Sequence, residues 1–211
     1  KGNCSLPFSF YCITDDPSNS NDEVITIHAD PKYEKVWAKM LLFSDLLPKN
    51  IPTLYLDLDV VVQKNIDGIL DWISQADDKL FIIDYDKLLL ESWDTTNLPR
   101  SSINSSLIGY ISGKHSDMFE HFDRDLDYYI LKYQGMDRYL THHHYSNTTT
   151  FNVKDFYFRT KILDSREDIV HEIKIPKKGI YVFHDPDKIF CVCNGSEEYS
   201  NFSDWIYRGL E

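Results

Sequence analysis

The segment Thr53 to Val62 (TLYLDLDVVV) constrains the fold of this 211-residue chain more than any other. Its apolar, β-branched and aromatic residues predict a buried strand. Two carboxylates, Asp57 and Asp59, interrupt the run, and an unpaired charge in a dry strand is costly. Residues two apart in a strand project from the same side, so both aspartates can face one cation. The plain alternative is that one faces water at the strand end and the other pairs with a lysine.

Other segments show the same kind of pattern. Strands are predicted at Phe8 to Thr14, Val24 to Ile27, Phe81 to Asp84 and Ile180 to Phe183. Asp30 and Pro31 predict a helix start, and the apolar spacing of the following residues predicts an amphipathic helix that Pro48 ends. Strands that alternate with helices predict an α/β sandwich.

The remaining segments are predicted from periodicity and polarity. Met118 to Tyr133 has a helical pattern, whereas Leu88 to Asn104 is predicted to be a loop or lid. His142 to Thr150 is polar and is predicted to be irregular, with the three histidines in a solvated loop. Asp84-Tyr85-Asp86 repeats the spacing of two aspartates and is expected to be a strand end beside the site.

Length and charge narrow the class of protein. A chain of 211 residues with 42% apolar content predicts a single domain over residues 1–211. A net charge of −12 disfavours nucleic acid as a partner, while a small anion remains possible beside a cation or a few lysines. The sequence has no apolar run of about 18 residues, so no membrane span is expected. The first residue is Lys1, which fits a piece of a longer protein.

The segment YLDLDVVVQKNIDGIL, residues 55–70, resembles the DXD segment of GT-A glycosyltransferases, especially the glycogenin and family 8 group, in which the strand leads into an "NID" helix. Further resemblances lie at Lys39, at Asn104-Ser105-Ser106, at Gly135-Met136-Asp137, and at Val182-Phe183-His184 followed by Lys188. Together these resemblances extend over nearly the whole chain. The implied fold is a GT-A (Rossmann-like) three-layer sandwich with a mixed, mainly parallel central sheet.

The resemblance also implies roles for residues. Asp57, Asp59 and His184 are the expected metal ligands, with Mn²⁺ favoured over Mg²⁺ by the histidine. Catalysis is assigned to Asp57, Asp59 and Asp137. The expected donor contacts are Tyr11, Thr14, Asp15, Lys39, Asp57, Asn104, Ser105, Asp137 and Lys188. Three departures from the family pattern concern sugar contacts and Lys188: Ser106 replaces a glycine, a glutamine after Asp137 is absent, and the interval from His184 to Lys188 is short.

The implied reaction is transfer of a sugar from a UDP-sugar to a hydroxyl of a glycan acceptor, with retention of the anomeric configuration. The chain looks most like small GT-A domains encoded by chloroviruses, which implies synthesis of a viral glycan. Asn104 lies in one of five Asn-x-Ser/Thr sequons. A glycan there would block the expected donor site, so a cytoplasmic location is predicted.

Three other classes of protein were weighed. The string LDLDVV matches the signature of haloacid-dehalogenase-like phosphohydrolases that use Mg²⁺, although those enzymes carry it near the N-terminus. A non-catalytic nucleotide-sugar binding module is compatible with the composition. A non-haem iron oxygenase would need an HxD motif in place of DxD.

Overall fold

The computed structural model describes residues 3–16, 22–58, 60–62, 64–75, 78–84 and 101–151, together with the backbone of four short strands farther along the chain. The strands are β1 (Phe10–Thr14), β2 (Val24–His28), β3 (Pro52–Leu56), β4 (Val60–Val62), β5 (Leu80–Asp84), β6 (Ile103–Ile111), β7 (Thr148–Thr150), β8 (Phe156–Arg159), β9 (Glu172–Lys174), β10 (Tyr181–Phe183) and β11 (Phe190–Cys193). The helices are η2 (Lys35–Phe43), α1 (Asp67–Ser74), α2 (Ser116–Arg124), α3 (Leu126–Tyr133), α4 (Met136–His144) and η3 (Tyr145–Asn147).

The largest sheet has four strands in the order β3-β6-β5-β7. Strand β6 is antiparallel to β3 and to β5, and β7 is parallel to β5. Strands β3, β5 and β7 therefore run in one direction and β6 runs in the other. The predicted mixed α/β architecture is confirmed. The sheet is mixed, as predicted, but it is not mainly parallel: two of its three strand pairs, β3–β6 and β5–β6, are antiparallel.

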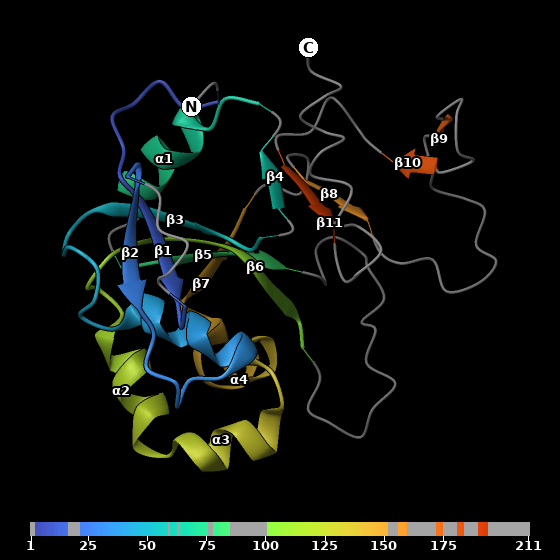
Figure 1. The fold of residues 1–211 in the computed structure, drawn as a ribbon. Coiled ribbons are helices and arrows are strands. Elements are labelled where there is room, and N and C mark those ends of the chain that lie inside the picture. Colours follow the sequence, from blue (N-terminus) through green and yellow to red (C-terminus); the bar gives the residue numbers. More distant parts are fainter. Residues whose placement is uncertain are drawn as a thin grey trace.

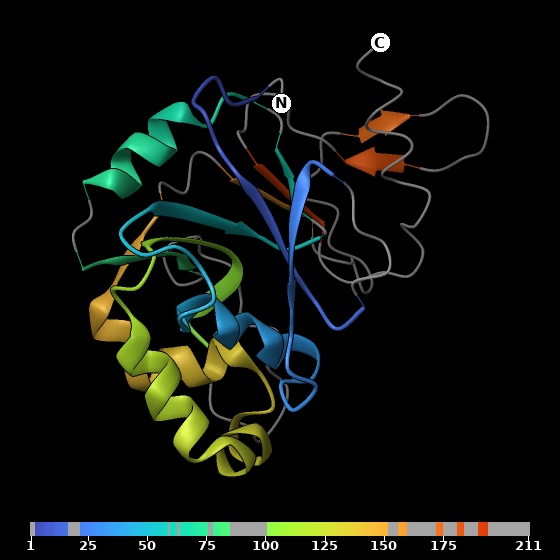
Figure 2. The same ribbon diagram turned by 60° about the vertical axis from the view of Figure 1, so that its left-hand side comes forward.

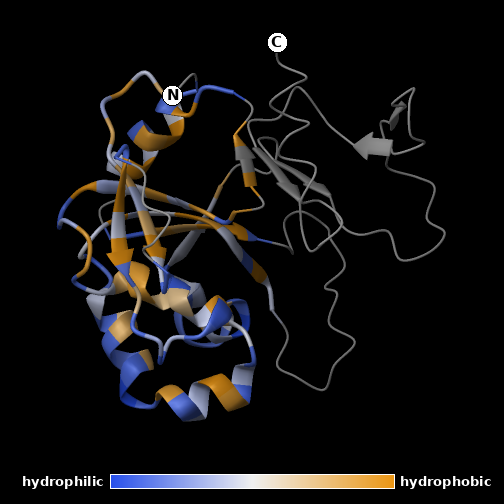
Figure 3. Cartoon of the chain, in the orientation of Figure 1, coloured by the Kyte–Doolittle hydropathy of each residue, from blue (hydrophilic) through white to orange (hydrophobic). Residues whose placement is uncertain are grey.

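Helices cover both faces of this sheet. Figures 1 and 2 show α1 on one side and η2, α2, α3 and α4 gathered on the other. Alternate residues of β5 supply the two cores: Leu80 and Ile82 join the larger cluster beneath η2 and α2–α4, while Phe81 and Ile83 join the smaller cluster beneath α1. This alternation is the period-two rule of strands. Figure 3 shows hydrophobic colour along the sheet and alternating colour along the helices.

The remaining strands form small sheets. Strand β1 pairs with β2 in parallel, β11 lies between β4 and β8, and β10 pairs with β9. The predicted strands near residues 8–14, 24–27, 81–84 and 180–183 are confirmed to within two residues. No helix among the described residues is long and apolar enough to cross a bilayer.

The prediction of one continuous strand from Thr53 to Val62 is wrong. The segment consists of β3 and β4, which belong to different sheets, with Asp57 and Leu58 outside both. The backbone N–H of Val60 donates to the carbonyl of Asp57 at 3.0 Å, which closes a turn. Leu58 is fully exposed at this turn. The strand is thus interrupted at Asp57, where the chain bends and the carboxylate is partly exposed.

Several predicted helix boundaries also need correction. The first helix begins at Lys35, not at Pro31, and it is a 3-10 helix. Asp30 instead accepts a hydrogen bond from the backbone N–H of Lys32, forming a local turn before the helix. The segment Met118 to Tyr133 contains two helices, because Asp125 separates α2 from α3.

The predictions for residues 101–150 need two corrections. Strand β6 begins at Ile103, so the last two residues of the expected loop belong to a strand whose nine residues are all buried, while residues 88–100 of that loop lie outside the described residues. The run His142-His143-His144 is the last turn of α4 and not a loop, and β7 follows at Thr148. His144 faces the core and is 9% exposed, which explains why helical packing prevails over the polarity of the run.

Candidate functional site

The pairing of β6 with β5 is irregular near the carboxyl ends of β3 and β5. The register of β6 with β5 changes from Ile82 opposite Ile108 to Ile83 opposite Asn104, so the residues between Asn104 and Ile108 bulge away from β5. The backbone N–H of Asp57 donates to the carbonyl of Ser106 at 2.9 Å. Bulges of this kind re-aim side chains and are common beside active sites. The bulge brings the Asn-Ser-Ser segment against the carboxyl end of β3.

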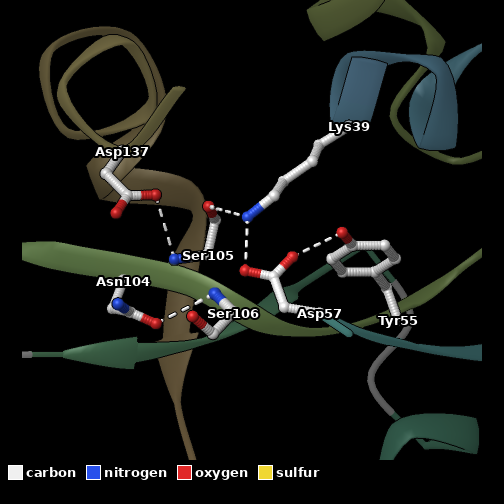
Figure 4. A network of polar contacts seen from close by, with 7 residues as sticks. All are labelled: Lys39, Tyr55, Asp57, Asn104, Ser105, Ser106 and Asp137. Atoms are coloured by element: carbon white, nitrogen blue, oxygen red, sulfur yellow. Dashed lines mark hydrogen bonds and ion pairs between the residues drawn. The ribbon is translucent and has the colours of Figure 1, made fainter. Parts of the chain in front are cut away.

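Lys39 reaches this edge from η2. Its Nζ donates to Oδ2 of Asp57 at 2.7 Å and to Oγ of Ser105 at 3.3 Å (Figure 4). The side chains of Lys39 and Asp57 are 16% and 20% exposed. For Asp57, the arrangement matches the alternative in which a lysine pairs with one of the two aspartates. The ion pair is partly buried. It holds both side chains in place at a position that solvent still reaches.

Tyr55 completes the surroundings of the Asp57 carboxylate. Its hydroxyl donates to Oδ1 of Asp57, while Lys39 occupies Oδ2 (Figure 4). The Nζ of Lys39 also lies 5.7 Å from the centre of the Tyr55 ring. Sequence reasoning did not select Tyr55, although its position two residues before Asp57 on an extended chain was the available signal.

Asp137 approaches the site from the first turn of α4. Its Oδ1 accepts the backbone N–H of Ser105 at 3.0 Å. Desolvation raises the pKa of the Asp137 carboxyl, while hydrogen bonding by Ser105 and the charge of Lys39 act in the opposite direction. A carboxylate in the first turn is also favoured by the helix dipole. Asp137 thus joins α4 to the bulge of β6 and lies in the same network as the ion pair.

Asn104 turns into the protein at the start of β6. Its Oδ1 accepts the backbone N–H of Ser106 at 2.9 Å, and the residue is 5% exposed. This contact shapes the bulge from within. It also means that the folded chain has no room for a glycan on Asn104, whatever the compartment.

The predicted residues at the end of β1 have other partners in the structure. Thr14 Oγ1 accepts the backbone N–H of Asp16 at 3.1 Å, and Asp15 is exposed. Tyr11 packs against the larger core cluster. Among the described residues, no hydrogen bond or ion pair joins these three side chains to Asp57 or Lys39. The structure therefore places five predicted residues in one network: Lys39, Asp57, Asn104, Ser105 and Asp137.

Three predicted residues, Asp59, His184 and Lys188, lie outside the described residues. Of the expected metal ligands, only Asp57 is described. Over the described ranges, no group of three or more His, Cys, Asp or Glu side chains is placed to hold a metal ion. The described part of the site has two carboxylates: the lysine and the tyrosine contact both oxygens of Asp57, and Asp137 accepts the backbone N–H of Ser105.

Asp84 and the histidine run take structural positions. Asp84 is 3% exposed at the end of β5, and its Oδ2 accepts the hydroxyl of Tyr145 at 3.1 Å. His143 Nε2 lies 2.9 Å from the hydroxyl of Tyr133, and His144 Nε2 lies 3.4 Å from that of Tyr139. These histidines pack among the aromatic side chains of α3 and α4, away from the Lys39 network.

Comparison of the chain with models of protein families, with curated proteins and with solved structures finds no match. The geometry of the site and the resemblance of its motifs are therefore the basis for a function.

Proposed function

We propose that this chain is a metal-dependent glycosyltransferase of the GT-A kind, which transfers a sugar from a UDP-sugar to a hydroxyl of a glycan. One observation carries the proposal: Lys39 of η2, Asp57 of the turn after β3, Ser105 of β6 and Asp137 of α4 form one polar network. The network lies at the carboxyl end of β3. Ligands of open α/β sheets bind at that edge, outside the carboxyl ends of the strands.

The network has the chemistry that a nucleotide-sugar donor requires. Lys39 supplies a positive charge for a diphosphate, and a lysine ammonium carries three N–H donors. Asp57 and Asp137 supply carboxylate oxygens, which accept hydrogen bonds from ribose or sugar hydroxyls. The lysine can bind the phosphates of a ligand while the carboxylates beside it bind the hydroxyls, so together they orient the ligand.

A divalent ion would supply a Lewis acid that stabilises the departing diphosphate. Asp57, Asp59 and His184 are the residues proposed to hold it, and Mn²⁺ is favoured over Mg²⁺. Lys39 would then neutralise the remaining charge on the diphosphate from the side of η2. Asn104 and Ser105 would contact the sugar through the bulge of β6.

The proposed stereochemical outcome is retention. None of the described site carboxylates has to serve as a nucleophile, since Asp57 is paired with Lys39 and Asp137 accepts a backbone hydrogen bond. A front-face route, in which the leaving phosphate oxygen helps deprotonate the acceptor, fits this arrangement. Proton NMR of the product distinguishes retention from inversion, and an inverted product would require a general base instead.

Thermal unfolding with Mn²⁺, with UDP, and with both together tests the function. A glycosyltransferase should show a larger shift with both ligands than the sum of the separate shifts, because metal and diphosphate bind as a unit. A ligand at 100 times its Kd adds about 2.7 kcal/mol of stability. A haloacid-dehalogenase-like enzyme would respond to Mg²⁺ alone and would release phosphate from a generic ester.

Turnover separates an enzyme from a binding module. Incubation with a panel of UDP-sugars should give slow release of UDP from one of them, and Asp59→Ala should abolish it. Lys49→Met is the matched control, since Lys49 forms an exposed ion pair with Asp45 at 2.7 Å, away from the network. Binding of UDP and Mn²⁺ without UDP release from any sugar, with or without an acceptor, would identify a binding module.

A further inference from the structure

We propose that Lys39 is a built-in competitor of the divalent ion at Asp57, and that the diphosphate of the donor removes this competition by drawing Lys39 away. The inference rests on the proposed function and adds a regulation of the same site. It predicts that the free protein binds a divalent ion weakly. It also assigns the coupling between metal and nucleotide to one ion pair.

Both oxygens of the Asp57 carboxylate have a hydrogen-bond donor. Oδ2 accepts from the Nζ of Lys39 at 2.7 Å, and Oδ1 accepts from the hydroxyl of Tyr55. A metal ion that chelated this carboxylate would have to displace both donors. A metal ion on Oδ2 alone, at about 2.1 Å, would lie less than about 5 Å from the ammonium nitrogen. Two cations so close in a partly buried site repel each other strongly.

Lys39 is able to change partners when a ligand arrives. Within the described part of the chain, its Nζ donates to Asp57 and to Ser105, which leaves one of its three N–H groups for a third partner. Its side chain is 16% exposed, so solvent and an anion can reach it. A diphosphate carries more negative charge than Asp57 and competes directly for the ammonium. Transfer of Lys39 to the diphosphate frees Oδ2 for the metal ion.

The other side of the carboxylate has its own support. Tyr55 holds Oδ1 independently of Lys39, so Asp57 keeps its orientation when the lysine leaves. The backbone N–H of Asp57, hydrogen-bonded to the carbonyl of Ser106, fixes the main chain at the same residue. The lysine is therefore the exchangeable partner, and tyrosine and backbone are the permanent ones.

The test is a double-mutant cycle of Lys39→Met and Asp57→Asn, with Mn²⁺ binding measured by electron paramagnetic resonance of the free ion, without nucleotide. Lys39→Met should tighten Mn²⁺ binding about tenfold in the wild-type background. In the Asp57→Asn background the same substitution should change it less than about twofold. Lys49→Met, which removes an exposed Lys–Asp pair of equal length, should leave Mn²⁺ binding unchanged.

Repetition with saturating UDP completes the design. UDP should strengthen Mn²⁺ binding to the wild-type protein and to Lys39→Arg, which keeps the positive charge. It should strengthen binding to Lys39→Met much less, because the competitor is already absent. Circular dichroism checks folding, and Lys39→Gln, which keeps a hydrogen-bond donor without the charge, replaces Lys39→Met if the latter unfolds.

The outcomes separate the two proposals. If Lys39→Met tightens Mn²⁺ binding equally in the wild-type and Asp57→Asn backgrounds, the lysine acts only through long-range charge. If Lys39→Met does not tighten Mn²⁺ binding, the lysine does not compete with the ion. Either result overturns the inference. If UDP strengthens Mn²⁺ binding to the wild-type protein in either case, the proposed function still stands. If UDP has no effect on Mn²⁺ binding to the wild-type protein, the proposed function and the inference both fail.

Discussion

The backbone N–H of Ser105 donates to Oδ1 of Asp137 at 3.0 Å, which ties the bulge of β6 to the first turn of α4. Asp137→Ala leaves this N–H without its acceptor. A buried donor left unsatisfied costs about 1–3 kcal/mol, so we expect a loss of that size in urea unfolding at pH 7. UDP release from the donor sugar should fall as well, because the bulge also carries the Ser105 hydroxyl that contacts Lys39.

Asp137→Asn is the variant to compare with Asp137→Ala, because its amide oxygen still accepts the backbone N–H of Ser105. Desolvation raises the pKa of Asp137, so this group favours the folded state most below its unfolded pKa, and the benefit is lost as pH rises through the folded pKa. The neutral amide has no such loss. We therefore expect the stability difference to shift in favour of Asp137→Asn as pH rises from about 4. A constant difference would show that desolvation does not govern this carboxyl.

Tyr55→Phe tests the support of Asp57. The substitution removes one hydrogen bond to a charged group, which is worth about 1.5–3 kcal/mol when buried and less at this partly exposed position. We expect weaker binding of UDP with Mn²⁺ and a small loss of stability. Tyr110→Phe is the control: its hydroxyl donates to the carbonyl of Leu42 at 2.7 Å within the core. That variant should lose stability without a change in binding, and equal binding loss in both would make the Tyr55 effect a general one.

The sequence predicted β3 and β5, which lie on either side of β6, better than β6 itself. Asp57 was selected from its charge in an apolar strand and Lys39 from the resemblance to the DXD family, and the structure pairs them. The bulge could not be predicted, because it depends on the register of β6 against β5. That register is set by tertiary packing, and Asn104-Ser105-Ser106 is typical of a loop when its neighbours in space are unknown.

The histidines of α4 show a second limit of prediction from sequence. A run of three polar residues predicts solvent exposure, yet the helix buries His144 against Tyr139, while His142 and His143 stay exposed and His143 contacts Tyr133. Helical geometry assigns adjacent residues to different faces, so a run of one residue type has no single environment. Neither periodicity nor composition contains that information until the helix and its packing partners are known.

His144 should make stability depend on pH. Burial, together with the nearby His143 and His121, lowers the pKa of His144 to about 4 from an ordinary value of 6.5. The neutral ring therefore stabilises the folded state fully above about pH 6.5, and the contribution is lost as pH falls toward 4, by about 3 kcal/mol in all.

The variant His144→Gln removes that titration and should flatten the decrease of unfolding free energy between pH 7 and 4. His142→Gln, an exposed position on the same helix turn, should retain the wild-type slope. Chemical denaturation at a series of pH values measures both. An unchanged slope in His144→Gln would assign the acid sensitivity to other groups.

Gly109 in β6 permits the close approach of α1 to the sheet. A Cβ at this position would lie 2.6 Å from Cδ1 of Ile73 and 3.0 Å from Cζ of Phe151, closer than side chains tolerate. Gly109→Ala should therefore destabilise the fold by about 1–3 kcal/mol through overpacking. Adding Ile73→Val removes the nearest methyl group and should restore part of the loss.

The matched control for Gly109 is Gly68 in α1, where a Cβ would meet nothing within 4 Å. Gly68→Ala should stabilise the protein by about 0.5–1 kcal/mol, because alanine has the higher helix propensity. Urea unfolding of the single and double variants measures these changes at one pH. A Gly109→Ala protein as stable as the wild type would mean that α1 is free to move away from β6.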